Sequence, residues 1–184
     1  MQIGNQQRPD IFARRIIKPP PLTTEIIEVA ERIDSQGDIL KDLEVNTLEE
    51  RLLRINNKIT KSIAISFINS YLNPVHEKKA AETARRLGFK FVTVSSELSS
   101  MIKFLDRTET AVVNAYLAPI IRNYLKDIDN QLQALKFRVM TSAGGLVNAH
   151  LFEPVDSLLS GPAGGVVGAA VKGRQLGENN LITF

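Results

Sequence analysis

The feature that most restricts the fold of this chain is a nearly continuous apolar run at residues 62–69, followed by a helical segment and a second apolar run. A strand exposed on one face would alternate apolar and polar residues, so this run predicts a central strand covered on both faces. Asn73 and Pro74 predict the start of the helix, with Asn73 as N-cap, and Gly88 predicts its end. Residues 89–94 predict the next strand. A strand–helix–strand unit indicates a parallel sheet and an α/β fold.

The segments before this unit have weaker signals. Residues 25–42 predict a β-hairpin, because turn-forming residues at 34–37 separate two apolar stretches. Thr47 and Glu50 have the spacing of a capping box, which predicts a helix over 48–57.

The second half of the chain is predicted to be mainly helical. Residues 100–136 carry apolar side chains at steps of three and four, and Pro119 is expected to kink or divide this helix. A short hairpin is predicted over 138–147 and a helix over 157–177. Residues 180–184 are interpreted as a buried strand that ends with the chain, which suggests a piece of a longer protein.

Composition excludes several classes of function. The 184 residues include no cysteine and two histidines, so thiolate chemistry and a multi-histidine metal site are excluded. No apolar run is long enough to span a membrane, and no signal core precedes the domain, so we expect a cytoplasmic protein that does not contact membranes. The net charge of +3 lies on an irregular, proline-containing arm at residues 1–22. Because a nucleic-acid binder usually carries its basic residues on the folded face, we expect no nucleic-acid partner.

A glycine-rich helix is the most informative candidate site. Gly161, Gly164 and Gly165 follow Ser160 at the predicted helix start, and Gly168 lies one turn further on. A glycine inside a helix costs about 1 kcal/mol relative to alanine, so something must require bare backbone here. Close helix packing and close approach of a phosphate to the helix N-terminus are the two explanations. The spacing matches no nucleotide-binding fingerprint, which favours packing.

Other candidates have simpler explanations. Gly144 and Gly145 lie in a turn after a predicted strand, where a hairpin turn and a ligand-binding loop are both consistent with the sequence. His76, in the first turn of its helix, is expected to be exposed, and His150 is expected in a loop without a catalytic triad. Glu97 is either a general base or, more simply, a solvated or capping carboxylate, and residues 106–109 are interpreted as a charged helix face or junction.

Two glycine-containing motifs resemble the hydantoinase A/5-oxoprolinase family. They are the Met-Thr-Ser-Ala-Gly-Gly-Leu sequence at 140–146 and the Leu-Leu-Ser-Gly-Pro-Ala-Gly-Gly sequence that begins at Leu158. Supporting similarity lies at residues 4–12, 67–77 and 113–119, so the resemblance covers most of the chain.

The resemblance implies an actin-like, ribonuclease-H-like α/β fold with a mixed sheet and flanking helices. It also implies an enzyme that uses ATP and Mg²⁺ to open a five-membered cyclic amide, with phosphorylation of an amide or carboxylate oxygen as the activating step. Residues 23–184 would span the end of the N-terminal region and the start of the main domain. The family's two Asp-x-Gly-Gly-Thr phosphate loops are not in this sequence, so the chain alone is expected to be inactive and to bind no cofactor.

Two alternatives remain open at this stage. One is a non-catalytic α/β module that binds a partner, and the other is a subunit of an ATP-dependent ketone carboxylase. The expected partners are a cyclic-amide substrate, the rest of the parent chain and a second hydantoinase-type subunit, with self-association also open.

Overall fold

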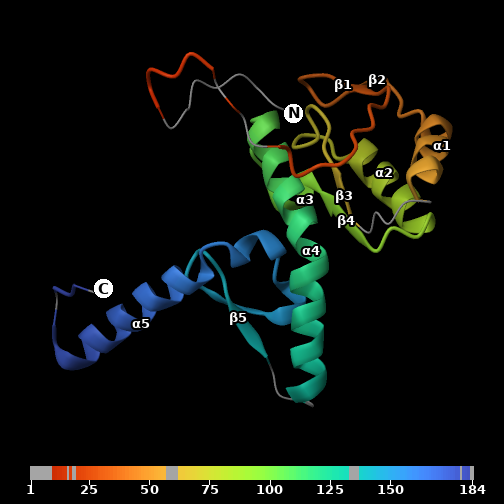
Figure 1. Ribbon diagram of the computed structural model, residues 1–184. Coiled ribbons are helices and arrows are strands. Elements are labelled where there is room, and N and C mark those ends of the chain that lie inside the picture. Colours follow the sequence, from red (N-terminus) through yellow and green to blue (C-terminus); the bar gives the residue numbers. More distant parts are fainter. Residues whose placement is uncertain are drawn as a thin grey trace.

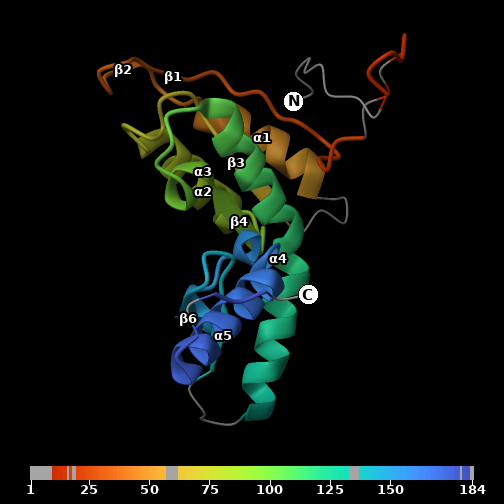
Figure 2. The ribbon, with the colours of Figure 1, turned by 90° about the vertical axis from the view of Figure 1, so that its left-hand side faces the viewer.

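The computed structural model describes residues 10–15, 17, 20–56, 62–132, 137–178 and 180–182. One long helix, α4 (Phe104–Leu132), runs along the molecule and joins its two ends (Figure 1). Segments within residues 62–98 contact this helix towards its N-terminal end, and the segment at residues 154–157 contacts it further along (Figure 2). The described residues of the arm, 10–15, 17 and 20–22, contain no helix or strand.

The predicted strand–helix–strand unit is confirmed. Strands β3 (Ser62–Ile65) and β4 (Phe91–Val94) pair in parallel, and helix α2 (Val75–Arg86) connects them. The helix begins at Val75, so Pro74 holds the N-cap position predicted for Asn73, and the side-chain oxygen of Asn73 accepts the Val75 N–H at 3.2 Å. Gly88, at φ +91°, follows the end of the helix as predicted.

Strand β3 differs from its prediction in two respects. It ends at Ile65 instead of residue 69, because the chain turns there and the Phe67 N–H donates to the carboxylate of Glu77 at 2.8 Å. Within the described residues β3 pairs only with β4, so here it is an edge strand and not a central one. It contacts both α2 and α4.

The predicted hairpin forms, but its strands are short. Strands β1 (Arg32–Ile33) and β2 (Ile39–Lys41) pair antiparallel. The Asp34 carboxylate accepts the backbone N–H groups of Asp38 at 2.9 Å and Gln36 at 2.8 Å, and these bonds lower the pKa of Asp34. Gly37 lies at φ +92°, which glycine adopts without strain. Residues 25–31 do not form the first part of the predicted hairpin, because within the described residues they pair with no strand.

Helix α1 (Val45–Asn56) begins three residues before its predicted start. The expected capping box is therefore wrong, since Thr47 lies within the helix. Its hydroxyl donates to the Glu44 carboxylate at 3.5 Å.

The main core lies in the N-terminal part of the molecule. Apolar side chains from α1, β3, α2 and β4 form it, and all are at most 7% exposed: Leu43, Leu48, Leu52, Ile65, Ala80, Ala81, Ala84, Phe89 and Val94. The alanines of α2 let the helix lie close to the two strands.

The long helix α4 follows a single turn of helix, α3 (Ser95–Leu98). Helix α4 continues through Pro119, so the proline does not divide it as predicted. The predicted helix end at 133–136 lies outside the described residues.

The C-terminal part contains the second predicted hairpin, formed by β5 (Arg138–Met140) and β6 (Leu146–Asn148). The 3₁₀ turns η1 (Ala149–Leu151) and η2 (Pro154–Ser157) lead to helix α5 (Ser160–Leu176). The predicted terminal strand is wrong for the described residues 180–182. They have no strand partner there, and the Ile182 side chain is 84% exposed.

These elements confirm the α/β class. The described strands form three separate two-stranded sheets, not one mixed sheet.

Candidate functional site

The two glycine-rich segments that the sequence singles out lie side by side. Gly144 adopts φ +81° in the turn between β5 and β6, and a Cβ atom there would lie 3.2 Å from Val167 of α5. A Cβ atom on Gly164 would lie 3.6 Å from Met140 of β5. The bare backbone of the turn therefore lets the first half of α5 approach the hairpin closely.

The backbone donors of this turn are largely used within the protein. The N–H of Thr141 donates to the Gly145 carbonyl at 2.8 Å, and the N–H of Gly144 donates to the Thr141 carbonyl at 2.9 Å. The N–H of Ser142 donates to the carbonyl of Asp156 at 2.9 Å. The N–H of Gly145 donates to the Thr141 hydroxyl at 3.3 Å. These bonds leave little of the turn's backbone to hold a phosphate group.

The start of α5 presents a different surface. The Ser160 hydroxyl donates to the Ser157 carbonyl at 3.0 Å, which ties the helix start to η2. A Cβ atom on Gly161, Gly165 or Gly168 would meet nothing within 4 Å. Among the described residues, no neighbouring element occupies the flat face that these three glycines form.

A second cluster of polar groups lies at the ends of β3 and β4, where parallel strands commonly carry functional loops. Glu77 of α2 is fully buried. Its carboxylate accepts the Phe67 N–H at 2.8 Å, the Ser95 hydroxyl at 2.6 Å, and the N–H and hydroxyl of Ser96 at 3.0 and 2.6 Å. One side chain thus holds both strand-end loops in place.

Arg107 of α4 completes this cluster and is also fully buried. Its guanidinium donates to the Ser95 hydroxyl at 3.0 Å, to the Met101 and Phe67 carbonyls at 2.7 Å each, and to the Ser70 hydroxyl at 3.0 Å. The prediction that residues 106–109 form a charged, solvated helix face is therefore wrong for Arg107. The alternative in the same prediction, a junction, fits this side chain, since it joins α4 to the β3–α2 loop, to the start of α3 and to the α3–α4 loop.

Ser95 links the two buried charges. Its hydroxyl donates to Glu77 and accepts from Arg107, so a carboxylate and a guanidinium are paired through one oxygen atom. The sequence analysis predicts the burial of neither Glu77 nor Arg107. The available signal was spacing: Arg107 precedes Ala111 by four residues, and Glu77 precedes Ala81 by four, so each charge lies on the apolar face of its helix.

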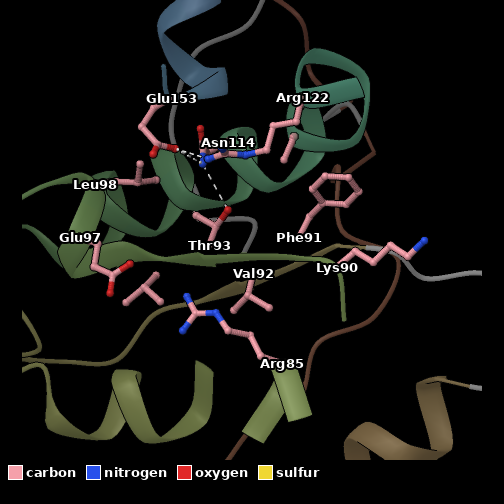
Figure 3. A pocket seen from close by; sticks show the side chains of 12 residues that line it. Arg85, Lys90, Phe91, Val92, Thr93, Glu97, Leu98, Asn114, Arg122 and Glu153 are labelled. Atoms are coloured by element: carbon pink, nitrogen blue, oxygen red, sulfur yellow. Dashed lines mark hydrogen bonds and ion pairs between the residues drawn. The ribbon is translucent and has the colours of Figure 1, made fainter. Parts of the chain in front are cut away.

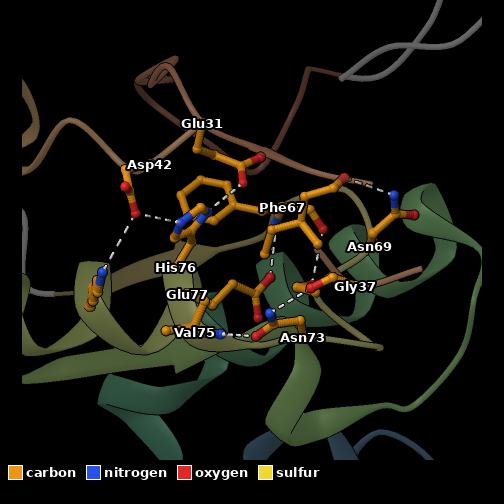
Figure 4. Close-up of polar contacts among 12 residues, drawn as sticks. Glu31, Gly37, Asp42, Phe67, Asn69, Asn73, Val75, His76 and Glu77 are labelled. Carbon is orange, nitrogen blue, oxygen red and sulfur yellow. Dashed lines mark hydrogen bonds and ion pairs between the residues drawn. The ribbon is translucent and has the colours of Figure 1, made fainter. Parts of the chain in front are cut away.

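His76 is fully buried, so its predicted exposure is wrong. Its Nδ1 atom lies 2.8 Å from the Glu31 carboxylate, and its Nε2 atom has no hydrogen-bond partner among the described residues (Figure 4). Asp42 Oδ1 is 3.8 Å from Nε2.

The cause of this burial is the β1–β2 hairpin, which folds over the start of α2. The Asn69 amide donates to the Ile33 carbonyl at 3.0 Å, and the Asn73 amide donates to the Gly37 carbonyl at 2.8 Å (Figure 4). Side chains between β3 and α2 therefore hold the hairpin in place. His150, which was expected in a loop, lies in the 3₁₀ turn η1, with its Nε2 atom 3.9 Å from the Asp129 carboxylate and a side chain that is 75% exposed.

A cavity of about 380 Å³ lies beside β4 (Figure 3). Charged side chains of both signs line it: Arg85, Lys90, Glu97, Arg122 and Glu153. Glu97 is exposed in α3, which fits the prediction of a solvated carboxylate. The described residues that line this cavity include no histidine, and their one hydroxyl group, that of Thr93, accepts a hydrogen bond from the Asn114 amide at 3.2 Å.

Asn114 anchors the inner wall of this cavity. Its amide nitrogen donates to the Thr93 hydroxyl at 3.2 Å and to Glu153 at 3.3 Å, and its oxygen accepts the Val155 N–H at 2.9 Å. Arg122 pairs with the same Glu153 carboxylate at 3.2 Å. The wall is therefore a fixed polar network between α4, β4 and η2.

In the part of the chain that the structure describes, no group of three histidine, aspartate or glutamate side chains could hold a metal ion. None of the described helices is both long and apolar enough to cross a membrane.

An α/β fold with glycine-rich segments at strand and helix ends is shared by many protein families with different activities, so the family is identified by sequence comparison. The model of the hydantoinase/oxoprolinase N-terminal region matches residues 1–88, and the hydantoinase/oxoprolinase model matches residues 107–184. The chain belongs to the hydantoinase/oxoprolinase family.

Curated relatives include a 5-oxoprolinase of Saccharomyces cerevisiae, which is 39% identical over 90% of this chain and 15% of its own length. The 5-oxoprolinase of Dictyostelium discoideum is 36% identical over 91% of this chain and 16% of its own length. The chain thus spans less than a third of the length of the first relatives it matches, which include an uncharacterized protein of Methanocaldococcus jannaschii at 28%.

Two solved structures share the fold. An ATP-dependent caprolactamase from Pseudomonas jessenii aligns with a TM-score of 0.74 and 26% identity, over 90% of this chain and 26% of that one. Nucleotide-free acetone carboxylase aligns with a TM-score of 0.70 and 30% identity, over 81% of this chain and 22% of that one.

Proposed function

We propose that this chain is part of an ATP-dependent hydrolase that opens a cyclic amide, either a five-membered lactam or an imide. The observation that carries the proposal is the match to two hydantoinase/oxoprolinase models, together with 5-oxoprolinase relatives that are 36–39% identical. The caprolactamase fold adds a second cyclic-amide enzyme. On this proposal the whole protein adopts an actin-like ATPase fold and acts in the cytoplasm.

ATP and Mg²⁺ are the cofactors that this proposal assigns to the whole protein. When bound, they would activate an amide or carboxylate oxygen by phosphorylation. The described residues do not fit such a site: they offer no three-carboxylate cluster for the metal, and the turn beside α5 uses most of its backbone donors internally. We therefore assign the phosphate loops to other parts of the protein, and we expect the isolated chain to be inactive.

We assign the glycine face of α5 to close packing in the longer protein, not to phosphate binding. The glycine spacing of Gly161, Gly165 and Gly168 matches no nucleotide fingerprint, and their Cβ positions point into open space. A helix or loop from the rest of the protein would account for the cost of three helical glycines.

A ketone carboxylase subunit is the second candidate function. Acetone carboxylase shares the fold, and the acetophenone carboxylase gamma subunit of Aromatoleum aromaticum is 29% identical over 90% of this chain. A second, hydantoinase-type subunit is the partner that both candidates share. A partner-binding module without catalysis remains the non-enzymatic alternative.

The test is an ATP hydrolysis assay on the full-length protein, purified with any subunit that copurifies. We expect ATP hydrolysis that depends on a five-membered cyclic amide such as 5-oxoproline or N-methylhydantoin, with the opened product detected by mass spectrometry. Hydrolysis that depends instead on caprolactam, a seven-membered lactam, would keep the reaction class but refute the five-membered ring. Hydrolysis that depends on acetone or acetophenone plus bicarbonate would support the carboxylase instead. Failure to hydrolyse ATP with any of these compounds would leave the non-catalytic module as the better description. ATP hydrolysis by the 184-residue chain alone would refute the expected inactivity of that chain.

A further inference from the structure

The contacts that hold the β1–β2 hairpin over the start of α2 include three made by polar side chains. Of the residues in the two strands only Ile33 is buried, so little apolar surface fixes the hairpin. Asn69 and Asn73 each donate to one hairpin carbonyl, at 3.0 and 2.8 Å. The third contact is the pairing of His76 with Glu31 (Figure 4). Where apolar burial is small, individual polar contacts decide how readily a segment opens.

His76 lies between two carboxylates at the base of this hairpin. Glu31 immediately precedes β1, and its carboxylate lies 2.8 Å from Nδ1. Asp42 immediately follows β2, and its carboxylate lies 3.8 Å from Nε2, which is beyond hydrogen-bond distance. The side chains of His76 and Glu31 are 1% and 9% exposed, whereas that of Asp42 is 78% exposed. The imidazole therefore has a fixed partner on one side and a movable one on the other.

The protonation state of His76 decides whether this arrangement is complete. An ionised carboxylate only accepts hydrogen bonds, so the short contact makes Nδ1 the donor to Glu31. A neutral ring then has a bare acceptor at Nε2, which faces a second acceptor and has no hydrogen-bond partner among the described residues. A second proton turns Nε2 into a donor toward Asp42, and the positive ring compensates the charge of the buried Glu31.

Other charges near this cluster do not replace the histidine. Lys79 of α2 lies 3.9 Å from the same Asp42 oxygen, but both side chains are largely exposed, so this pair is weak. The carboxylate of Glu77 points to the strand-end loops instead. In the hairpin turn, backbone N–H groups, first that of Asp38, lower the pKa of Asp34, so this carboxylate stays ionised at neutral pH. Histidine is the side chain that ordinarily changes its charge between about pH 5 and 8.

We propose that His76 is a proton-operated latch for the β1–β2 hairpin. With protons on both nitrogens, the imidazole holds Glu31 and Asp42 together, and the hairpin stays closed over residues 69–76. When Nε2 loses its proton, Asp42 is released and the hairpin opens more readily. The closed state is therefore most stable below the pH range of histidine titration, and this stability is lost as the pH rises through that range. Because residues 69–76 follow the carboxyl end of β3, the latch sets how readily this strand-end loop meets solvent.

Hydrogen–deuterium exchange with residue-level fragmentation tests the latch on the full-length protein, with the 184-residue chain in parallel. Exchange is corrected for its intrinsic pH dependence. We expect the amides of residues 32–41, and that of Glu44, which donates to the Ala30 carbonyl, to be at least roughly threefold better protected at about pH 5.5 than at about pH 8. The amides of β4 are the internal control and should be protected alike at both. Equal hairpin protection at the two pH values, or better protection at the higher one, would overturn the proposal.

Three variants assign the pH dependence to the latch. Asp42→Asn changes a largely exposed side chain, so the protein should still fold, and its amide can donate to the neutral ring. The pH dependence of hairpin protection should therefore be lost in this variant. Asp38→Asn, at the exposed position before β2, is the matched control and should keep it. His76→Gln should also lose it, whatever the absolute protection. A pH dependence that persists in Asp42→Asn would contradict the latch, and this variant decides the matter even if His76→Gln fails to fold.

Nitrogen NMR of the 184-residue chain measures the protonation of His76 directly, because the chain contains two histidines and the other, His150, is 75% exposed. We expect Nδ1 to keep its proton throughout the titration and Nε2 to lose its proton as the pH rises. Loss of the Nδ1 proton instead would place the shared proton on Glu31 and refute the latch. Neither exchange nor NMR uses catalytic activity, so failure of the latch is distinguishable from a failed ATP assay.

Discussion

At the scale of single residues, two buried charges do most to fix the strand-end loops. Glu77 and Arg107 are both fully buried, and each satisfies its hydrogen-bonding capacity with loop backbone and serine hydroxyls. A buried charge is tolerated only when it is paired and hydrogen-bonded, so removing one member leaves the other uncompensated. These side chains organise the loops; no contact in the structure assigns them a chemical step.

Replacement of Glu77 tests whether this buried carboxylate stabilises the segments at the ends of β3 and β4. We expect Glu77→Ala to lower the free energy of unfolding by about 3–5 kcal/mol, because four donors lose their acceptor and the buried Arg107 charge loses the carboxylate linked to it through Ser95. Glu77→Gln, which keeps one acceptor oxygen, should lose less. Urea denaturation followed by circular dichroism measures both. Glu82→Ala, on the exposed side of the same helix, is the control and should change stability by less than about 0.5 kcal/mol. Similar midpoints for Glu77→Ala and Glu82→Ala would contradict this role.

At the scale of elements, the glycines of the C-terminal part fall into two groups. Gly144 is required by its turn, because it lies at φ +81° and α5 leaves little room for a Cβ atom. Gly168 lies inside α5 with open space around it, so nothing in the described structure requires it. Glycine is thus required by the backbone conformation at Gly144, whereas at Gly168 it leaves a helix surface with no neighbour among the described residues.

Alanine substitutions separate these two groups. In the 184-residue chain we expect Gly168→Ala to raise the free energy of unfolding by about 0.5–1 kcal/mol, because alanine favours the helix. Gly144→Ala should lower it by about 1–2 kcal/mol, because alanine is strained at positive φ. Thermal and urea unfolding measure both variants. Destabilisation of the short chain by Gly168→Ala would show that this face is already packed, contrary to the structure.

At the scale of the whole molecule, α4 joins two regions of unequal packing. The main core consists of residues between Leu43 and Val94. After residue 137, the buried apolar side chains are those of Ala149 and Phe152, together with Pro154. Many large apolar side chains of α5 and its approach are exposed instead, including Leu159 at 64% and Val166 at 66%. Fewer buried contacts mean that less free energy opposes local opening.

Limited proteolysis tests this difference in local stability. Trypsin should first trim the exposed arm at sites such as Arg14 and Arg15. Within the rest of the 184-residue chain we expect it to cut first in residues 137–178, at sites such as Lys172 and Arg174, and to cut at Arg85 and Arg86 of α2 much later. The N-terminal half of α4 and the strand–helix–strand unit should survive as a fragment on denaturing gels and in mass spectra. Simultaneous cleavage of α2 and α5 would indicate that the two regions unfold as one unit.

The sequence by itself determined the elements whose signals are local. The strand–helix–strand order, the end of α2 at Gly88 and the hairpin turn at Gly144 follow from apolar runs and from residues with particular backbone preferences. The family could also be identified from the sequence, because its two glycine-containing motifs lie in short segments, one at residues 140–146 and one that begins at Leu158. Local backbone chemistry and short-range periodicity are sufficient for such features.

Only the tertiary structure decided which polar residues are buried. The first turn of α2 looks solvated in sequence, yet the β1–β2 hairpin covers His76, and Glu77 faces the loop that begins at Ser95. Arg107 appears to belong to a charged stretch, yet its guanidinium reaches carbonyl groups 6 and 40 residues away along the chain. The burial of a charge depends on partners brought together by long-range packing, and no local pattern records them. For the same physical reason, the terminal segment at 180–182 has the composition of a buried strand but stays exposed where no neighbouring strand is present to pair with it.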